Sequence, residues 1–161
     1  MAFFRILQPK RRPQDHPSPR AERLLIDARR TAEAYGHPQI ETVHVLLGLI
    51  DLNRGAGFVT LKKLGVEPAR IRRSLMPEIL ALPRKPHGTA PRHSADCERL
   101  LKLAAVEAEA CGHTYYGTAH ILLALTMTRD QRTARILDMA GVDLIQAQQA
   151  ARQALAALNP G

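Results

Sequence analysis

Apolar residues recur along the first part of the chain at the three- and four-residue spacing of an α-helix. Leu24, Ala28 and Ala32 fall on one stripe, as the buried face of an amphipathic helix does. Ser18, followed by a proline, is a typical N-cap, and Gly36 follows the last periodic residue, where a left-handed C-terminal turn favours glycine. The pattern predicts a helix between Ser18 and Gly36.

Three more helices are predicted before residue 81. The second begins at Thr42, interpreted as its N-cap, and is apolar nearly all round, as expected for the centre of a bundle. A short third helix ends at Gly65. The fourth begins at Glu67, where an acid suits the helix dipole, and Ile71 and Leu75 mark its buried side.

The same pattern returns 76 residues later. Shifted by that offset, residues 22–76 match residues 98–152 without a gap, with identical residues at eighteen of the fifty-five positions. Such self-similarity indicates an internal duplication. We therefore predict an all-α fold, an eight-helix bundle of two tandem four-helix repeats related by pseudo-two-fold symmetry. The clearest pairs are Gly36-His37 with Gly112-His113, Thr42 with Thr118, His44 with His120, and Gly65-Val66 with Gly141-Val142.

The predicted boundaries follow from the repeats and from the proline content. We assign residues 1–17 to a basic disordered tail and residues 18–80 to repeat 1. Residues 81–93 form a proline-rich linker, and residues 94–158 form repeat 2. The two repeats together are expected to make one compact domain.

The composition supports packed helices and narrows the function. Aromatic content is low and tryptophan is absent, so the core must be built from aliphatic residues. The formal net charge is +8, of which residues 1–20 carry +4 and residues 81–95 carry +3. Basic tails attract phosphate, so nucleic-acid or anionic-surface binding through the N-terminal tail and the linker is our alternative function. Solvated basic segments are the commoner case, and we expect nucleic acid not to be the main partner.

Targeting and redox features are sparse. No run approaches the roughly eighteen apolar residues of a membrane span, and the N-terminus does not resemble a signal peptide. We therefore predict a cytoplasmic protein with no membrane association. Cys97 and Cys111 lie fourteen residues apart on one predicted helix, about 20 Å at 1.5 Å per residue, and are expected to stay reduced.

The duplicated histidines are candidates for chemistry. His37 and His113 follow the C-terminal glycines, and His44 and His120 lie in the first turn of the central helices. A zinc site would require ligands at helical i, i+4 spacing with a third ligand, and none recurs in both copies. We expect capping or packing roles, no metal, no cofactor and no catalytic residue. The chain also lacks a nucleophile elbow and a P-loop. The residues indicate a helical binding module and not an enzyme.

One pattern occurs twice in the chain: A-x-x-x-A-x-x-x-G-H-x-x-x-x-T-x-H-[IV]-L-L-x-L. A short helix and then Gly65-Val66 or Gly141-Val142 follow it. This double pattern resembles the Clp N-terminal repeat. This is the domain at the front of the ClpA- and ClpC-type AAA+ unfoldases, and the resemblance covers about residues 18–158. It implies an eight-helix, non-catalytic domain that docks adaptors or substrates. The ATPase modules of the unfoldases are not in this sequence, which implies a stand-alone protein or part of a longer one.

One departure from the family's pattern bears on recognition. ClpC-type domains read T-E-H where this chain has Val43 and Ala119 between the threonine and the histidine. In that family the glutamate recognises the guanidinium of phosphorylated arginine, and a carboxylate suits a guanidinium because it can accept two hydrogen bonds. The nearest acid here is Glu41, so standard phosphoarginine recognition is expected to be lost.

The resemblance implies a protein partner, namely a Clp unfoldase, an adaptor or a protease substrate. We place the candidate contact surface at the two turns, residues 37–44 and 113–120. The oligomeric state is not predicted. The candidate partner-binding residues are Glu41, Val43, His44, Tyr115, Tyr116, Ala119 and His120.

Overall fold

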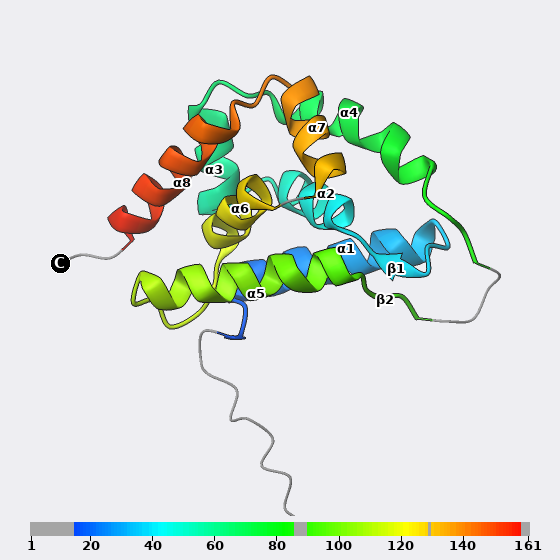
Figure 1. Cartoon of the computed structure of the whole chain (residues 1–161), viewed down its shortest axis with the longest axis horizontal. Helices are drawn as coiled ribbons and strands as arrows, with labels where there is room; N and C mark the ends of the chain where they lie inside the picture. The colour runs from blue at the N-terminus through cyan, green and yellow to red at the C-terminus, as the bar shows by residue number, and fades with distance from the viewer. Residues whose placement is uncertain (1–14, 86–89, 129, 159–161) are drawn as a thin grey trace, which may run out of the picture.

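The computed structural model describes residues 15–85, 90–128 and 130–158. Eight helices account for most of the described chain, and two strands of two residues each complete it (Figure 1). The predicted all-α fold of two four-helix repeats is confirmed. The elements are α1 (Pro19–Ala34), β1 (Gln39–Ile40), α2 (Thr42–Leu52), α3 (Ala56–Lys63), α4 (Pro68–Leu80), β2 (Arg92–His93), α5 (Ala95–Ala110), α6 (Thr118–Met127), α7 (Gln131–Met139) and α8 (Leu144–Ala157).

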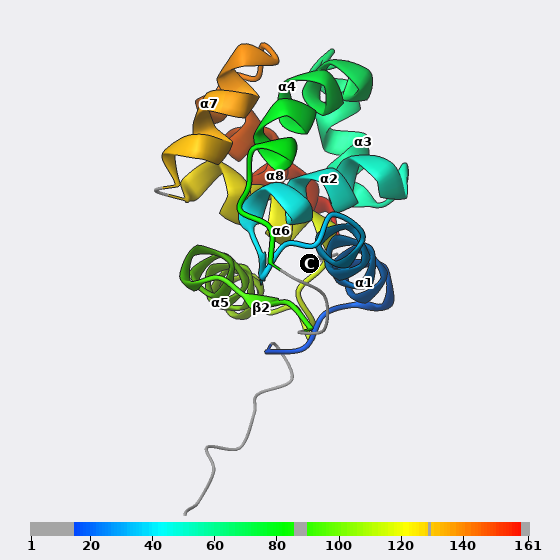
Figure 2. The same cartoon turned by 90° about the vertical axis from the view of Figure 1, so that its right-hand side faces the viewer.

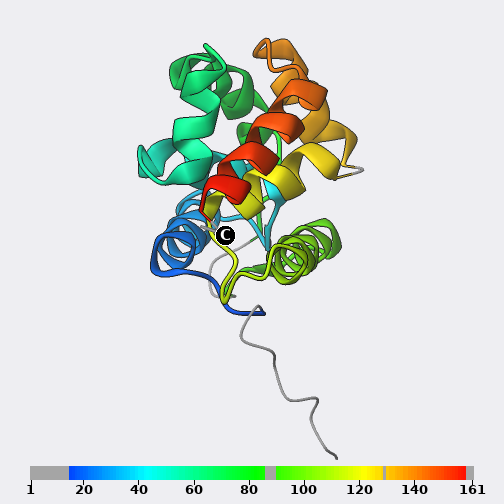
Figure 3. The same ribbon diagram turned by 90° about the vertical axis from the view of Figure 1, so that its left-hand side faces the viewer.

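The helices lie in layers around the two central ones. The long helices α1 and α5 form the lower layer in Figure 1, and Figure 2 shows both of them end-on beneath α2 and α6. The remaining four helices cover the other side, where α8 crosses over α6 (Figure 3). The central helices α2 and α6 are buried almost throughout, from Thr42 to Ile50 and from Thr118 to Thr126. Their apolar runs therefore place them in the core, as the sequence predicts.

The ends of the helices follow local sequence rules. Ser18 and Ser94 cap α1 and α5, where each hydroxyl accepts a backbone N–H three residues later, from Ala21 at 3.3 Å and from Cys97 at 3.1 Å. Gly36 adopts φ +68° after α1, so that the His37 N–H reaches back to a carbonyl of the last turn at 2.8 Å. Together with the hydrogen bond from the Gly36 N–H to the Glu33 carbonyl, this bond forms a Schellman motif, whose positive φ glycine adopts without steric cost. The equivalent glycines after α3, α5 and α7 do the same, at Gly65, Gly112 and Gly141.

The predicted N-caps of the central helices were wrong. Glu41 and Gly117 are the N-cap residues, and Thr42 and Thr118 are the first residues of their helices. The threonine side chains point to the other repeat. Thr118 Oγ1 accepts the N–H of Gly57 in α3 at 3.1 Å. Thr42 contacts residues at the start of α7 in the symmetry-related way.

The repeats exchange elements, which the sequence-based prediction of two units joined by a loop did not include. Helix α3 of repeat 1 packs on α6 and α8 of repeat 2, and α7 of repeat 2 packs on α2 and α4 of repeat 1. The lead-in segments cross over too. Strand β2, which precedes α5, pairs in parallel with β1 in the α1–α2 turn, and Pro17, which precedes α1, bridges to Tyr116 in the α5–α6 turn. The two repeats therefore form one intertwined unit.

The tail and the linker are in part outside the described residues. Residues 1–14 and 86–89 are not described, so the prediction of disorder there stays a prediction. Residues 15–17 belong to the described part, and Pro17 takes part in the bridge to Tyr116 rather than in a disordered tail. In the linker, Lys85 donates its N–H to the Gly36 carbonyl at 2.9 Å. The end of the tail therefore contacts the α5–α6 turn, and the start of the linker contacts the α1–α2 turn.

A substitution at Gly57 tests how closely α3 approaches α6. A Cβ at Gly57 would overlap the carbonyl group of Thr118, although Gly57 itself has ordinary helical geometry. Gly57→Ala should therefore lower the free energy of unfolding by about 1–3 kcal/mol, the usual cost of overpacking. Helix propensity alone predicts a gain of about 0.5–1 kcal/mol. Urea unfolding followed by circular dichroism measures the sign.

Gly65→Ala serves as the matched control. Gly65 has φ +75°, and a Cβ at this position would meet no other atom within 4 Å, so its substitution reports the backbone conformation without crowding. A stabilised Gly57→Ala protein would contradict the close approach of α3 to α6.

Candidate functional site

The duplicated turn of repeat 1 joins its two histidines directly. The Schellman motif after α1 places the His37 ring above the start of α2, where His44 is the third helical residue. His37 Nδ1 lies 2.9 Å from His44 Nε2, and both rings are buried, at 3% and 0% exposure. The backbone N–H of Glu41 donates to His44 Nδ1 at 2.8 Å. His44 thus occupies the position that a glutamate or glutamine takes in a capping box.

These hydrogen bonds fix the tautomers of the neutral rings. Because His44 Nδ1 accepts the Glu41 N–H, its proton must be on Nε2, from where it donates to His37 Nδ1. His37 in turn must carry its own proton on Nε2. Among the described residues, that buried N–H has no hydrogen-bond partner. The pair is therefore a directed chain of donors that ends at His37.

Repeat 2 contains the same chain. Gly117 N–H donates to His120 Nδ1 at 2.9 Å, and His120 Nε2 lies 2.9 Å from His113 Nδ1. His113 Nε2 also lacks a partner among the described residues. The histidines were expected to have capping or packing roles, and the inner histidine of each pair bonds to the N-cap N–H of its own helix. Each outer histidine bonds to the inner one.

Burial keeps the inner histidines neutral. Desolvation, and next to it the neighbouring ring of His37, lowers the pKa of His44 from its ordinary value of 6.5 to about 4. The pKa of His120 falls to about 4 for the same two reasons, with His113 as the neighbour. Protonation of both rings of a pair would place two like charges within hydrogen-bonding distance in the core. The two inner histidines are therefore held in the neutral state and are poor sources of protons near pH 7.

Within the part of the chain that the structure describes, metal-ligand types cluster only at the second turn. Ligand atoms of Cys111, His113 and His120 lie within 4.8 Å of one another. In repeat 1 the residue equivalent to Cys111 is Tyr35, whose ring stacks on His37 with centroids 5.7 Å apart.

The hydrogen bonds oppose a metal at this cluster. Metal-bound histidines usually donate their other ring N–H to an acceptor. His120 does the reverse, because its Nδ1 accepts the Gly117 N–H. A metal on Nε2 would leave this ring without any proton, as an imidazolate. The absence of a metal site stays a prediction, but the polarity of the turn supports it.

The structure places the predicted partner-binding residues unevenly. Tyr115 is half exposed, and Glu41 is partly buried. The other five are buried and belong to the interior of the two turns, where Tyr116 also pairs its backbone with the lead-in to α1. The five buried residues are Val43, His44, Tyr116, Ala119 and His120.

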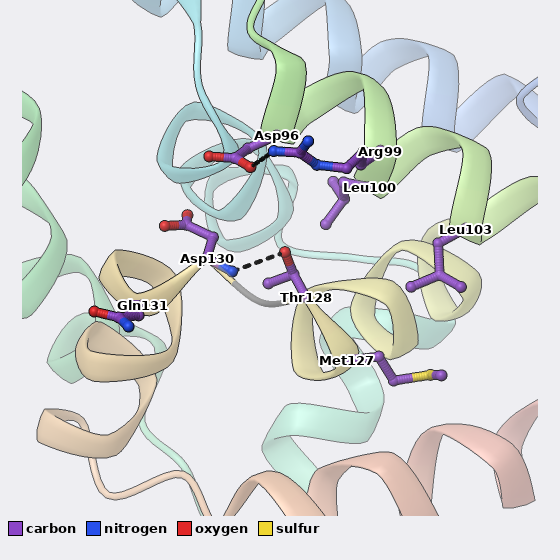
Figure 4. Close-up of a pocket in the computed structure, with 8 residues that line it drawn as sticks. All are labelled: Asp96, Arg99, Leu100, Leu103, Met127, Thr128, Asp130 and Gln131. Carbon is purple, nitrogen blue, oxygen red and sulfur yellow. Dashed lines mark hydrogen bonds and ion pairs between the residues drawn. The ribbon is translucent and has the colours of Figure 1, made fainter.

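A cleft that the sequence did not reveal lies on repeat 2 (Figure 4). It has a volume of about 590 Å³ and lies between α5, the end of α6 and the start of α7. Its size is within the range of ligand pockets. Residues from three separate segments line it, so only the packing of the helices brings them together. They are Asp96, Arg99, Leu100, Leu103, Met127, Thr128, Asp130 and Gln131.

The intertwined repeats and the paired turns define a class of protein, the helical double-repeat domains. The chain belongs to a particular family among them, the Clp repeat N-terminal domains, whose family model matches residues 16–140 and again residues 107–160. No helix in the described ranges is both long and apolar enough to cross a membrane.

Two curated relatives are similar over most of this chain. It is 32% identical over 136 residues to the chaperone protein ClpB of Oceanobacillus iheyensis, which covers 84% of this chain. It is 32% identical over 142 residues to the negative regulator of genetic competence ClpC/MecB of Bacillus subtilis, which covers 88% of it. The chain spans 17% of the length of each relative.

Solved structures share the fold. The Hsp104 N-terminal domain from Candida albicans superposes with a TM-score of 0.75 at 21% identity, covering 84% of this chain and 89% of that one. The ClpV N-domain in complex with a VipB peptide gives a TM-score of 0.67 at 17% identity, covering 85% of each chain. At these identities the likeness shows the fold alone.

Acid should destabilise the fold through the histidine pairs. The folded pKa values of His44 and His120 lie below the unfolded value of 6.5, so the unfolded state binds more protons between pH 6.5 and pH 4. The stabilisation is complete above pH 6.5 and is lost as the pH falls, on the order of 2 kcal/mol for each of the two inner histidines by pH 4.5. Urea unfolding at a series of pH values measures this slope.

His44→Gln and His120→Gln are the matched variants. Glutamine can still accept the N-cap N–H but does not titrate, so each substitution should remove about half of the slope while lowering stability at pH 7. A wild-type stability that stays constant from pH 7 to pH 5 would show that the pairs accept protons normally.

Zinc should not bind at the second turn. Because His120 Nδ1 is held as an acceptor, Zn²⁺ should raise the thermal unfolding temperature no more in the wild type than in Cys111→Ser. Differential scanning fluorimetry with and without Zn²⁺ measures this. A rise that disappears in Cys111→Ser, together with a cobalt–thiolate absorption band, would overturn the interpretation.

Proposed function

We propose that the chain is a non-enzymatic protein-binding module that acts in adaptor or substrate recognition, or in the regulation, of Clp-dependent proteolysis. Family membership is the observation that carries the proposal. The proposed site of action is the cytoplasm, and the proposed partners are a Clp unfoldase, an adaptor or a protease substrate. One neighbour in fold, the ClpV N-domain, is itself solved with a peptide, which supports a binding role.

The structure of the turns supports binding over catalysis. The two inner histidines are held neutral and in fixed tautomers by backbone N–H groups. The thiol of Cys97 is buried, and burial raises its pKa to about 12, which makes it a poor nucleophile. These groups, which are the usual general bases and nucleophiles, are engaged in holding the fold.

We further propose that phosphoarginine recognition of the family's usual kind is lost. Val43 and Ala119 are 0% and 1% exposed and carry no group that accepts a hydrogen bond. Glu41 is the nearest acid of the first turn, and it is the N-cap of α2 rather than its second residue. A guanidinium at either turn would therefore lack the carboxylate partner that the usual recognition requires.

Partner capture tests the proposal. The immobilised chain should enrich Clp unfoldases, their adaptors or protease substrates from a bacterial lysate, relative to an unrelated helical bundle of similar charge. Quantitative mass spectrometry measures the enrichment. Arginine and phosphoarginine forms of one peptide should bind with equal affinity in a fluorescence-anisotropy assay.

Two results would count against the proposal. Recovery of nucleic acid without any Clp component would favour the alternative function through the basic tail and linker. A clear preference for the phosphoarginine peptide would show that the turns still recognise the modification despite Val43 and Ala119.

A further inference from the structure

The cleft between α5, α6 and α7 has an apolar floor. Leu100, Leu103 and Met127 line it, with Leu100 buried and the other two partly exposed (Figure 4). A half-covered patch of aliphatic and thioether groups favours contact with a flexible aliphatic chain. The floor therefore suits an alkyl stem rather than a fully polar ligand.

Two carboxylates, those of Asp96 and Asp130, lie beside this floor (Figure 4). Asp96 lies in the first turn of α5, and Asp130 is the N-cap of α7. Asp130 accepts hydrogen bonds from Thr133 Oγ1 at 2.8 Å and from the Arg132 N–H at 3.0 Å, and it also bonds to Thr42. Although burial alone would raise the pKa of Asp130, these hydrogen bonds lower it below its ordinary value. Asp130 is thus held as an anion at the wall of the cleft.

The end of α6 adds a further negative feature. The other described helices return a hydrogen bond from the C-cap N–H to a helical carbonyl, whereas within the described residues Thr128 makes none and continues in an extended conformation. No basic residue lies in the last turn of α6. The last carbonyls of a helix and its dipole attract a cation. The cleft lies directly beside this end, through Met127 and Thr128.

The chain's own cation in the described lining is weakly held. Arg99 forms an ion pair with Asp96 one turn earlier, and its side chain is 72% exposed. Exposed ion pairs of this kind contribute little free energy. A second cation can therefore compete for Asp96 at small cost.

Repeat 1 provides a natural contrast. The residues equivalent to Asp96 and Asp130 are Arg20 and Arg54, so the acidic walls become basic. The residues equivalent to Leu103 and Met127 are Asp27 and Asp51, which form ion pairs on the surface. The combination of apolar floor and acidic walls is thus a property of repeat 2 and does not follow from the duplication.

We propose that this cleft binds a lysine side chain presented by a segment of a protein partner. The alkyl stem lies on Leu103 and Met127, and the ammonium group is placed between Asp96 and the carbonyl end of α6. Lysine suits such a site because its ammonium is compact and its stem is flexible. The inference rests on the proposed function, because it names the chemistry of the partner that the module would bind.

Nuclear magnetic resonance with methyl-labelled leucine and methionine tests the proposal on the full chain. The probe is Nα-acetyl-lysine methylamide, and its Nε-acetylated form is the neutral control. The lysine probe should shift the methyl signals of Leu103 and Met127 in a saturable and salt-sensitive way, and the acetylated form should not. Asp96→Asn should weaken the probe's apparent affinity about two- to fivefold.

Three variants make the test specific. Arg99→Gln removes the competing cation and should strengthen binding, a change opposite in sign to that of Asp96→Asn. Asp27→Asn, at the position of repeat 1 that is equivalent to Leu103, should leave binding unchanged. Arg129→Ala, next to Asp130 in the sequence, should not weaken it. Substitutions at the exposed Arg99, the half-exposed Asp96 and the partly exposed Asp27 should leave the amide spectrum of the fold intact.

Several results would overturn the proposal. They are equal shifts with the acetylated probe, shifts that map outside the cleft, or weaker binding in Arg99→Gln. If the chain still captures Clp components while the lysine probe fails to bind, the cleft assignment is wrong and the binding function stands. If capture fails while the lysine probe binds, the proposed function is wrong and the cleft site stands.

Discussion

Two helix N-termini meet at each of two places in this fold, and the rest of the structure depends on how they are accommodated. The start of α2 meets the start of α7, and the start of α6 meets the start of α3. Each N-terminus carries a partial positive charge and unpaired N–H groups. In one junction the Thr118 hydroxyl accepts the Gly57 N–H, and in the other the Asp130 carboxylate accepts from Thr42 and Thr133. The contact between the repeats therefore provides hydrogen-bond acceptors for the N-terminal ends of these helices.

This constraint explains the residues of the duplicated T-x-H motif. The threonine reaches across to the other repeat, the middle residue is buried in the core, and the histidine accepts the N-cap N–H of its own helix. The outer histidine of each pair then fixes the preceding Schellman turn to the same helix. A motif that could suggest a metal or a proton relay is a structural clamp in both copies. Its polarity, set by backbone donors, supports the prediction that it binds no metal.

Much of the fold could be predicted from the sequence because its signals are local. The serine caps, the glycines after α1, α3, α5 and α7 and the apolar central helices depend on a few neighbouring residues. The exchange of α3 and α7 could not be predicted in this way, because a period of 76 residues is equally compatible with separate or intertwined repeats. Gly55 and Gly57 lie where α3 approaches α6, but in the sequence they do not by themselves predict this contact. Two glycines so close together are typical of a loop, whereas Gly57 is helical and lies against Thr118.

The candidate site could be predicted less well than the helices, because it depends on which residues the packing leaves exposed. The two turns were identified because they recur in both copies, and a recurring turn contains residues that both repeats need for folding, so most of the chosen residues are buried. Tyr115 is half exposed and Glu41 is partly buried, and the equivalent residues of the other repeat are Gln39 and Gly117.

Positions where the copies differ carry a different kind of information. Equivalent hydrogen bonds fix the frame of both repeats, whereas the surface between α5, α6 and α7 differs in sequence from its counterpart. At that surface, aspartates replace arginines and apolar residues replace aspartates. The site that we propose on one side of a two-fold scaffold fits this division, in which the shared residues hold the fold and the unshared ones are available for recognition.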